Sequence, residues 1–409
     1  MTEFNTGDTA FMLVCSALVL FMTPGLALFY AGMVRKKNVL STTMQSFFAM
    51  GLVSVLWALV GYTIAFGSAD GPMGKFIGTF DKVLLKGVAL GASGVEGHLY
   101  PESVFAMFQG MFAIITVGLI TGAIAERMKF KAYVIFAAIW VLVVYSPLAH
   151  WVWGGGWLGM AGLGALDFAG GTVVHIASAA AALAAAIVLG RRKDYGSAAV
   201  QPHNLPMTIL GAGILWFGWF GFNAGSELAA DGVAGSAFMV THLAAAAGML
   251  GWLIAETIQH GKPTSLGAAS GAVAGLVAIT PASGFVDAGP GLLIGLAAGV
   301  ACYFGVQLKN KFKLDDALDV VGIHGVGGTL GALLTGVFAS KAINSLGADG
   351  SFAQLGKQAL GVAVAWVFSF VVSFIVLKII DATIGVRVDA EAEETGLDLF
   401  DHAETGYVL

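Results

Sequence analysis

Long apolar runs separated by short polar breaks fill almost the whole of this 409-residue chain. A helix needs about 20 apolar residues to cross the hydrocarbon core of a bilayer. Eleven such spans are predicted, near residues 9–34, 41–66, 102–125, 132–150, 171–190, 206–226, 235–257, 266–281, 289–308, 320–340 and 353–384. The alternating segments of an outer-membrane barrel do not occur in the sequence. The pattern predicts an all-α polytopic membrane protein with 11 transmembrane helices.

Composition supports this interpretation, because 57% of the residues are hydrophobic and only 11% are charged. Soluble domains carry about 25% charged residues, so a soluble globular domain is excluded. Glycine occurs 58 times, and small residues of this kind let membrane helices approach closely. Cys15 and Cys302 lie in apolar runs, where we expect small buried side chains rather than a disulfide or metal ligands.

The positive charges predict the orientation of the chain. Most of the 20 Lys and Arg residues lie in the loops after the odd-numbered spans, including residues 35–37, 127–131, 191–193 and 309–313. Loops rich in Lys and Arg stay in the cytoplasm. The sequence therefore predicts an N-terminus outside the cell and a cytoplasmic C-terminus.

Two spans share a motif in which an Asp precedes a His by eight residues. The fifth span contains Asp167 and His175, and the tenth contains Asp316 and His324. Eight helical residues rise about 12 Å, which places each His deep in the hydrocarbon. The predicted topology runs the two copies in opposite directions, so spans one to five and six to ten form an inverted 5+5 repeat with one extra helix. Such repeats place transport sites between the halves, near the midplane.

Paired imidazoles inside a membrane have a limited chemistry. They can hydrogen-bond a small neutral molecule or pass a proton. A metal site needs three or four converging ligands, so we expect no metal. No pattern of nucleophile, His and carboxylate stands out within the spans, which disfavours a hydrolase. His242 in the seventh span has no counterpart, and we expect it to be structural.

Aromatic residues gather at the outer ends of the fourth and sixth spans, where residues 150–157 include Trp153 and residues 219–226 include Phe222 and Ser226. Trp at this depth commonly belongs to the interfacial aromatic belt. An aromatic face beside a hydroxyl also binds cations such as ammonium. Phe112 in the third span is a candidate for an apolar constriction, although core packing is the favoured explanation when this residue is taken alone.

Five motifs together resemble the ammonium transporter family (Amt/Mep, with the Rhesus glycoproteins as relatives). They occupy residues 29–38, 165–175, 202–206, 219–225 and 322–327, within a resemblance that covers about residues 8–400. The resemblance implies a membrane domain over 1–384, with repeats at about 9–190 and 206–340 and an extra helix at about 353–384. It also implies a cytoplasmic regulatory tail over 385–409.

The resemblance implies roles for individual residues on the outer side. Trp153 and Ser226, with Phe112 beside them, would form the external site that recruits ammonium. Phe112 and Phe222 would stack as a gate below that site.

The resemblance also implies roles along the pore. His175 and His324 would be the twin pore-lining imidazoles and would relay a proton. Asp167 would organise the external vestibule, and Trp219 would line the pore as packing.

The implied function is a homotrimeric ammonium transporter or channel of the plasma (inner) membrane, with one pore per subunit. It would deprotonate ammonium and conduct ammonia past the histidines, with net charge transfer. The implied partners are ammonium or ammonia, membrane lipid and a PII-type regulatory protein at the cytoplasmic face. Neither a cofactor nor nucleic acid is expected, and the protein is not expected to be an enzyme.

Three other functions compete with this one. An ammonium sensor would bind ammonium and signal through its tail without carrying flux, although the tail is short. A Rhesus-like channel would conduct neutral gas, whereas Trp153 and Ser226 favour recruitment of an ion. An intramembrane enzyme is the least supported of the three.

Overall fold

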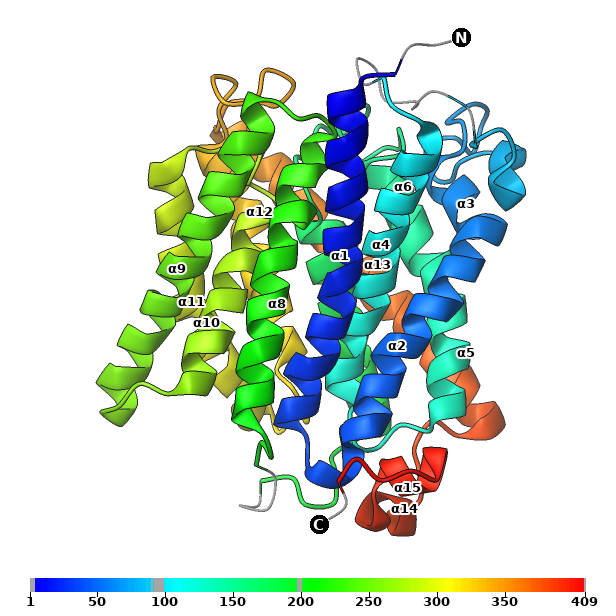
Figure 1. The fold of residues 1–409 in the computed structure, drawn as a ribbon, viewed down its shortest axis with the longest axis vertical. Helices are drawn as coiled ribbons and strands as arrows, with labels where there is room; N and C mark the ends of the chain where they lie inside the picture. The colour runs from blue at the N-terminus through cyan, green and yellow to red at the C-terminus, as the bar shows by residue number, and fades with distance from the viewer. Residues whose placement is uncertain (1–3, 90, 92–98, 197–200, 408–409) are drawn as a thin grey trace.

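The computed structural model describes residues 4–89, 91, 99–196 and 201–407. Residues 1–3 and 408–409, at the ends of the predicted membrane domain and tail, lie outside these ranges. Within them the chain forms helices and loops, with one isolated antiparallel bridge between Met128 and Arg387. The helices run roughly side by side (Figure 1). We call the end of the bundle near the N-terminus the upper face and the end near the C-terminus the lower face.

Ten helical segments of the described ranges are long and apolar enough to cross a membrane. They are Thr6–Met33 (α1), Lys36–Phe66, Glu102–Ile124 (α4), Phe130–Val152, Gly171–Leu189, Leu205–Glu227, Gly232–His260 (α9), Ala288–Phe312 (α11), Val321–Phe338 and Phe352–Ile384 (α13). The remaining predicted span, 266–281, forms the 15-residue helix α10, Ser265–Ile279. Helices thus occur in all eleven predicted ranges, but the shortness of α10 leaves ten with the length of a membrane span.

Five of these segments contain more than one type of helical turn. Their parts are η1 (Lys36–Asn38), α2 (Val39–Leu56), η2 (Trp57–Gly61) and α3 (Tyr62–Phe66); α5 (Phe130–Trp140), η4 (Val141–Tyr145) and α6 (Ser146–Val152); η5 (Gly171–Ile176) and α7 (Ala177–Leu189); α8 (Leu205–Ala224) and η6 (Gly225–Glu227); η7 (Val321–Gly325) and α12 (Val326–Phe338). Four of the inserts, η2, η4, η5 and η7, are single π-helical turns. Such turns frequently occur at functional sites, and η5 and η7 carry the two predicted pore histidines. A short helix, η3 (Phe80–Leu85), lies in the loop that precedes α4.

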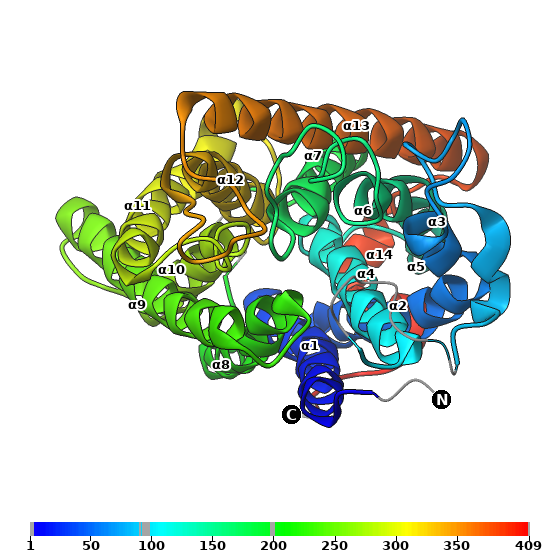
Figure 2. The ribbon, with the colours of Figure 1, turned by 90° about the horizontal axis from the view of Figure 1, so that it is seen from above.

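Glycine explains how closely the helices pack. A Cβ atom added to Gly211 of α8 would lie 2.3 Å from the backbone nitrogen of Phe29 in α1. One added to Gly275 of α10 would lie 2.1 Å from the carbonyl oxygen of Ala244 in α9. Both crossings bring one backbone directly against another, which larger side chains would prevent. Seen from above, α13 lies across the outside of the bundle (Figure 2).

A chain of buried charges joins the loops at the lower face. Arg192 donates to Glu126 at 2.9 Å and pairs with Asp315 at 2.8 Å, while Arg35 pairs with Glu126 at 3.0 Å. Burial by itself would raise the pKa of Glu126, but Arg192 and Arg35 outweigh it and hold the pKa below its usual range. The loops that carry most of the positive charge are therefore tied together by paired carboxylates.

The C-terminal tail folds against these loops instead of extending into solvent (Figure 1). It forms two short helices, α14 (Ala390–Thr395) and α15 (Leu397–His402). Asn38 and the tail cap each other's helices: the Asn38 side chain accepts from the Leu397 N–H at 2.8 Å, and Asp398 accepts from the Ser41 N–H at 2.8 Å. Each contact satisfies a backbone donor at the start of a helix, so α15 and α2 support one another.

We expect the substitution Arg192→Ala to destabilise the protein by about 3–5 kcal/mol, because it leaves the buried carboxylates of Glu126 and Asp315 without their shared partner. Lys378→Ala is the matched control. It breaks an exposed pair with Asp381 at 3.6 Å and should cost under about 1 kcal/mol. Thermal unfolding in detergent compares the variants, and equal losses in both would contradict this account.

Candidate functional site

Asp167 organises the first of the two predicted motifs. Gly170 has a φ of +122°, a backbone conformation that glycine adopts without strain, and the turn it makes brings the carboxylate over the start of η5. The Asp167 carboxylate accepts from the N–H groups of Gly170 at 2.8 Å, Gly171 at 2.6 Å and Thr172 at 2.7 Å, and also from the Thr172 hydroxyl. Burial raises the pKa of this carboxyl, while the donated hydrogen bonds act in the opposite direction. Asp167 thus satisfies the free donors with which the helix begins.

Asp316 occupies the corresponding position before η7 but makes fewer contacts. Its carboxylate accepts from the Val321 N–H at 2.7 Å, and its Oδ1 atom has no hydrogen-bond partner in the described part of the chain. Burial, and then the nearby Asp319, raise the pKa of Asp316 to about 6. The two motifs therefore share a sequence spacing and a helix start, while only Asp167 is fully satisfied.

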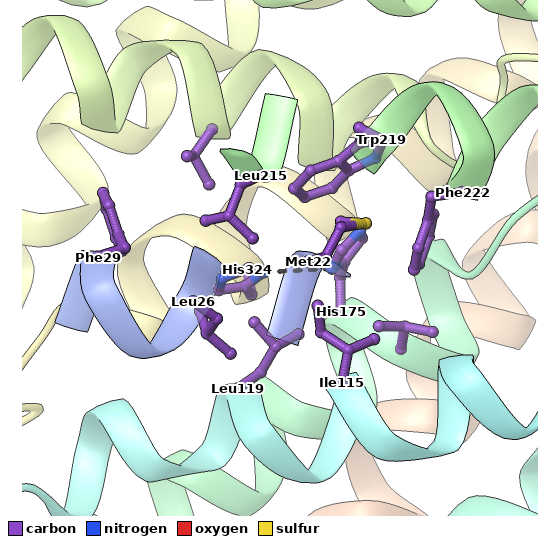
Figure 3. A pocket seen from close by; sticks show the side chains of 12 residues that line it. Met22, Leu26, Phe29, Ile115, Leu119, His175, Leu215, Trp219, Phe222 and His324 are labelled. Atoms are coloured by element: carbon purple, nitrogen blue, oxygen red, sulfur yellow. Dashed lines mark hydrogen bonds between the residues drawn. The ribbon is translucent and has the colours of Figure 1, made fainter. Parts of the chain in front are cut away.

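The two histidines meet in the interior of the bundle. Their Nδ1 atoms are 3.2 Å apart, and both side chains are buried (Figure 3). One Nδ1 must donate and the other accept, because two lone pairs or two hydrogens would repel at that distance. The His175 Nε2 atom has no partner among the described residues. The pair therefore shares one proton and keeps a free polar atom beside the cavity.

A narrow cavity contains this pair and is otherwise almost entirely apolar. It is lined by Met22, Leu26, Phe29, Ile115, Leu119, Val174, His175, Leu215, Trp219, Phe222, Val273 and His324 (Figure 3). Its volume is about 10 Å³, which is room for about one water molecule. The Trp219 indole N–H donates to the Thr280 hydroxyl at 2.9 Å, so this residue presents only its apolar ring to the cavity.

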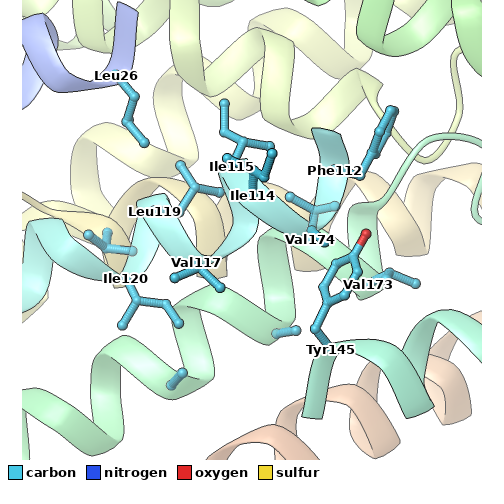
Figure 4. Close-up of a cluster of buried hydrophobic side chains, with 14 of the residues drawn as sticks. Leu26, Phe112, Ile114, Ile115, Val117, Leu119, Ile120, Tyr145, Val173 and Val174 are labelled. Carbon is cyan, nitrogen blue, oxygen red and sulfur yellow. The ribbon is translucent and has the colours of Figure 1, made fainter. Parts of the chain in front are cut away.

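The wall behind the cavity belongs to the main hydrophobic core. Ile115 and Leu119 of α4 lie in this cluster together with Val174 of η5 and Leu26 of α1 (Figure 4). A helix that is apolar on all sides is expected to be buried, and α4 is buried on nearly every side. The cavity wall is therefore fixed by the best-packed helix of the bundle.

Stacked phenylalanines separate this cavity from a wider one at the upper face. The Phe112 and Phe222 rings stack with centroids 4.1 Å apart, and Phe222 stacks in turn on His175 at 6.1 Å. Trp153 meets Phe112 edge to face at 6.2 Å. The wider cavity, about 550 Å³, is lined by Phe112, Trp153 and Ser226 among others. The structure thus aligns the predicted residues in one path from the upper face to the histidines.

Two hydrogen bonds fix the polar atoms of the wider cavity. The Trp153 indole N–H donates to the Asp167 carbonyl oxygen at 2.8 Å, which leaves only the ring for other contacts. The Ser226 hydroxyl donates to the Phe222 carbonyl oxygen at 2.8 Å, so its lone pairs remain available as acceptors. An aromatic surface and a hydroxyl acceptor therefore line the same space, a combination suited to a small cation.

The sequence interpretation did not single out Gln109. This residue also lines the wider cavity, one helical turn before Phe112, and its buried Oε1 atom has no partner within the ranges that the structure describes. In the sequence, this residue is a single amide side chain in an otherwise apolar span, and polar residues inside a membrane are often functional.

Three other sequence expectations concern residues away from the path. His242 is exposed on the surface of α9, 5.4 Å from the Trp216 ring, and lies outside this path. Cys15 and Cys302 are buried free thiols, as predicted. Within the described ranges, no three His, Cys, Asp or Glu side chains are placed to hold a metal ion.

Comparisons with known proteins cover nearly the whole chain. Residues 10–407 match the profile of the Ammonium Transporter Family. An ammonium transporter of Bacillus subtilis (strain 168) is 52% identical over 406 residues, which span 98% of each chain. The crystal structure of Mep2 from Saccharomyces cerevisiae superposes with a TM-score of 0.88 at 36% identity, covering 95% of this chain and 89% of Mep2. A structure named Sensor Amt Protein gives a TM-score of 0.88 at 31% identity, covering 97% of this chain and 98% of that one. The resemblance seen in the sequence motifs is therefore confirmed, and this chain belongs to the ammonium transporter family.

Proposed function

We propose that this multi-pass membrane transporter recruits ammonium at the upper face, removes a proton from it and conducts ammonia past His175 and His324, with net transfer of charge. One observation carries the proposal: the imidazoles meet at 3.2 Å in an apolar cavity with room for about one water molecule. A permanently charged ion cannot keep its hydration shell in such a space.

Recruitment rests on the chemistry of the wider cavity. Ammonium is a small cation that the face of Trp153 attracts through its ring electrons. Ser226 offers a hydroxyl oxygen that accepts a hydrogen bond from ammonium, and Phe112 closes the bottom of the space. Gln109 adds an unpartnered carbonyl oxygen as a further acceptor. In this assignment, Asp167 shapes the site by holding the Trp153 indole and the start of η5.

Selectivity follows from the apolar path below the cavity. Moving an intact ion between Phe112 and Phe222 and into the lumen carries a large desolvation cost. Ammonium escapes that cost by giving up a proton, whereas potassium, an ion of similar size, cannot. The gate therefore separates two similar cations by a reaction that only one of them undergoes.

The imidazole pair gives the separated proton a route. Ammonia donates to or accepts from the free Nε2 atom of His175 as it passes. The His175 Nε2 atom would accept the proton that ammonium loses, the Nδ1 hydrogen of that ring would pass to Nδ1 of His324, and His324 would release the hydrogen on its own Nε2 atom. Proton and ammonia would then cross together, and charge would move with the substrate.

We further propose that the bundle has eleven spans in an inverted 5+5 repeat plus α13. Helix α10 has 15 residues and rises about 22 Å, so the buried turn at 280–286 that follows it would complete the crossing. Domain bounds of 1–384 for the membrane part and 385–409 for a regulatory tail fit this arrangement. The lower face, where Lys and Arg gather, would be cytoplasmic in a plasma (inner) membrane, and the N-terminus would lie outside.

The partners of the proposed transporter follow from the same family resemblance. We propose a homotrimer with one pore per subunit, surrounded by membrane lipid. The tail is folded against the lower loops through Asn38 and Asp398, and we propose that a PII-type protein docks on this surface.

A second candidate function is an ammonium sensor. The similarity to the structure named Sensor Amt Protein favours it, at a TM-score of 0.88. A measurement of flux distinguishes the two functions, because a sensor would bind ammonium without carrying a current.

We expect the double substitution His175→Leu and His324→Leu to lower the ammonium-specific current about a hundredfold, which is the usual contribution of a positioned proton carrier. Full-length protein in liposomes on a solid-supported membrane, challenged with ammonium and with potassium, gives the measurement. His242→Leu is the matched control and should leave the current unchanged, since His242 lies on the surface of α9. An unaltered current and selectivity in the double variant would remove both histidines from the mechanism.

We expect Asp167→Asn to destabilise the protein by about 1–3 kcal/mol, because the amide places its own N–H groups among backbone donors that need an acceptor. Asp316→Asn is the control: its carboxylate accepts from the Val321 N–H at 2.7 Å, while its Oδ1 atom has no partner among the described residues, so the loss should be smaller. Thermal unfolding of both proteins provides the comparison. A greater loss of stability in the Asp316 variant would show that the number of hydrogen bonds donated to a carboxylate does not determine how much that carboxylate stabilises the protein.

A further inference from the structure

A buried histidine outside the pore has a carbonyl oxygen at each ring nitrogen. His150, in α6, has no exposed surface; its Nδ1 atom lies 2.9 Å from the Ala65 oxygen and its Nε2 atom 2.8 Å from the Gly74 oxygen. Carbonyl oxygens only accept hydrogen bonds, and a neutral imidazole has a single N–H to donate. A neutral His150 would therefore hold one nitrogen lone pair against an oxygen lone pair at hydrogen-bonding distance.

We propose that His150 is an imidazolium that donates to both carbonyls, and that it acts as a positioning residue for the recruitment site of Trp153. The inference deepens the proposed function and rests on it for the role of Trp153, while the protonation state of His150 stands on the hydrogen-bond geometry alone.

Two helix ends supply the negative potential that this cation needs. Ala65 lies in the last turn of the helical run Lys36–Phe66, where carbonyl groups lack partners within the helix. His150 itself lies in the last turn of α6. Cations are stabilised at helix C-termini because the aligned peptide dipoles point their negative ends there. The carbonyl groups thus take the place of a carboxylate partner.

Among the described residues, the charged and titratable groups around α6 do not hydrogen-bond the His150 ring. The helical segments packed against α6 contribute Tyr62 from α3, Tyr145 from η4 and His175 from η5, and the loops and α4 contribute Asp70, Lys75, Asp81, Lys82 and Glu102. Glu102 pairs with Lys82 and accepts from the Tyr62 hydroxyl at 2.8 Å. Asp81 accepts from the Thr79 hydroxyl at 2.6 Å. The hydrogen bonds of the His150 ring nitrogens in the described chain go to Ala65 and Gly74.

His150 is one of three donors that hold the same stretch of loop. The carbonyl oxygens of three consecutive residues, Gly74, Lys75 and Phe76, are bound at 2.8 Å, 3.2 Å and 2.7 Å. The donors are His150 Nε2, the Trp157 backbone N–H and the Trp151 indole N–H, in that order. The end of α6 is therefore clamped to this loop on consecutive carbonyls.

The clamp lies directly behind the recruitment site. The Trp153 N–H donates to the Ala149 oxygen at 2.8 Å, so the backbone of this Trp is held by the last turn of α6. A Cβ atom on the following residue, Gly154, would lie 2.0 Å from the Ala65 oxygen and 2.7 Å from His150 Nδ1, so the backbone is packed tightly onto the clamp. Without the second N–H of His150, one carbonyl would lose its donor, and the segment that carries Trp153 would loosen.

Nitrogen NMR of the full-length protein in lipid, with ¹⁵N-labelled histidine, tests the protonation state at neutral pH. We expect a histidine with hydrogen on both ring nitrogens whose nitrogens correlate with ¹³C-labelled carbonyls of alanine and glycine. The signal should vanish in His150→Gln and persist in His203→Gln. His203 is a suitable control because its nitrogens face the Val34 carbonyl and the Tyr407 hydroxyl, which a neutral ring satisfies.

A wild-type spectrum without a doubly protonated histidine near alanine and glycine carbonyls would overturn the inference, whether or not the His150 variant folds. The positioning role has a separate readout in the liposome currents. We expect His150→Gln to raise the ammonium KM about tenfold with a smaller effect on the maximal current, and His203→Gln to change neither. A wild-type protein without current would defeat the proposed function and leave the NMR result intact. A variant with the wild-type KM would defeat only the positioning role.

Discussion

The hydrogen bonds that an aspartate accepts from the first N–H groups of a helix determine where the histidine cavity lies. A helix that begins inside a membrane protein has free donors that water cannot satisfy, so some side chain must accept from them. Asp167 accepts from consecutive N–H groups and fixes the first residue of η5. The eight-residue spacing then places His175 where η7 brings His324, and the two Nδ1 atoms form a hydrogen bond at 3.2 Å.

Close helix packing stabilises the middle of the bundle, while ion pairs and hydrogen bonds stabilise the loops at its two faces. In the bundle, small residues bring backbones into contact, as at Gly211 against Phe29, and leave no room for the helices to slide. At the lower face, the pairs of Arg192 with Glu126 and Asp315 lock the connecting loops. At the upper face the loop before η3 is held through its carbonyl groups by the end of α6. Each end of the path is thus fixed independently of its apolar middle.

Much of this organisation was predictable from sequence, because membrane helices have a clear hydrophobic pattern and the Asp–His motif occurs twice. The positions of the helices and the family were predicted correctly. The shortness of α10 was not, since an apolar run does not reveal where a helix ends in a buried turn. Nor was the environment of His150: its neighbours in the sequence are aromatic, while its hydrogen-bond partners come from residues 65 and 74. The unequal satisfaction of Asp167 and Asp316 likewise depends on contacts that spacing does not encode.

The size of the histidine cavity has a consequence for the cell that would contain this protein. A continuous file of water conducts hydrogen ions quickly by exchange along the file, and any open aqueous passage would drain the electrochemical gradient that drives respiration and ATP synthesis. Space for about one water molecule, bounded above by rings 4.1 Å apart, cannot contain such a file. At this constriction a proton would therefore move through the hydrogen-bonded imidazole pair rather than along a chain of water.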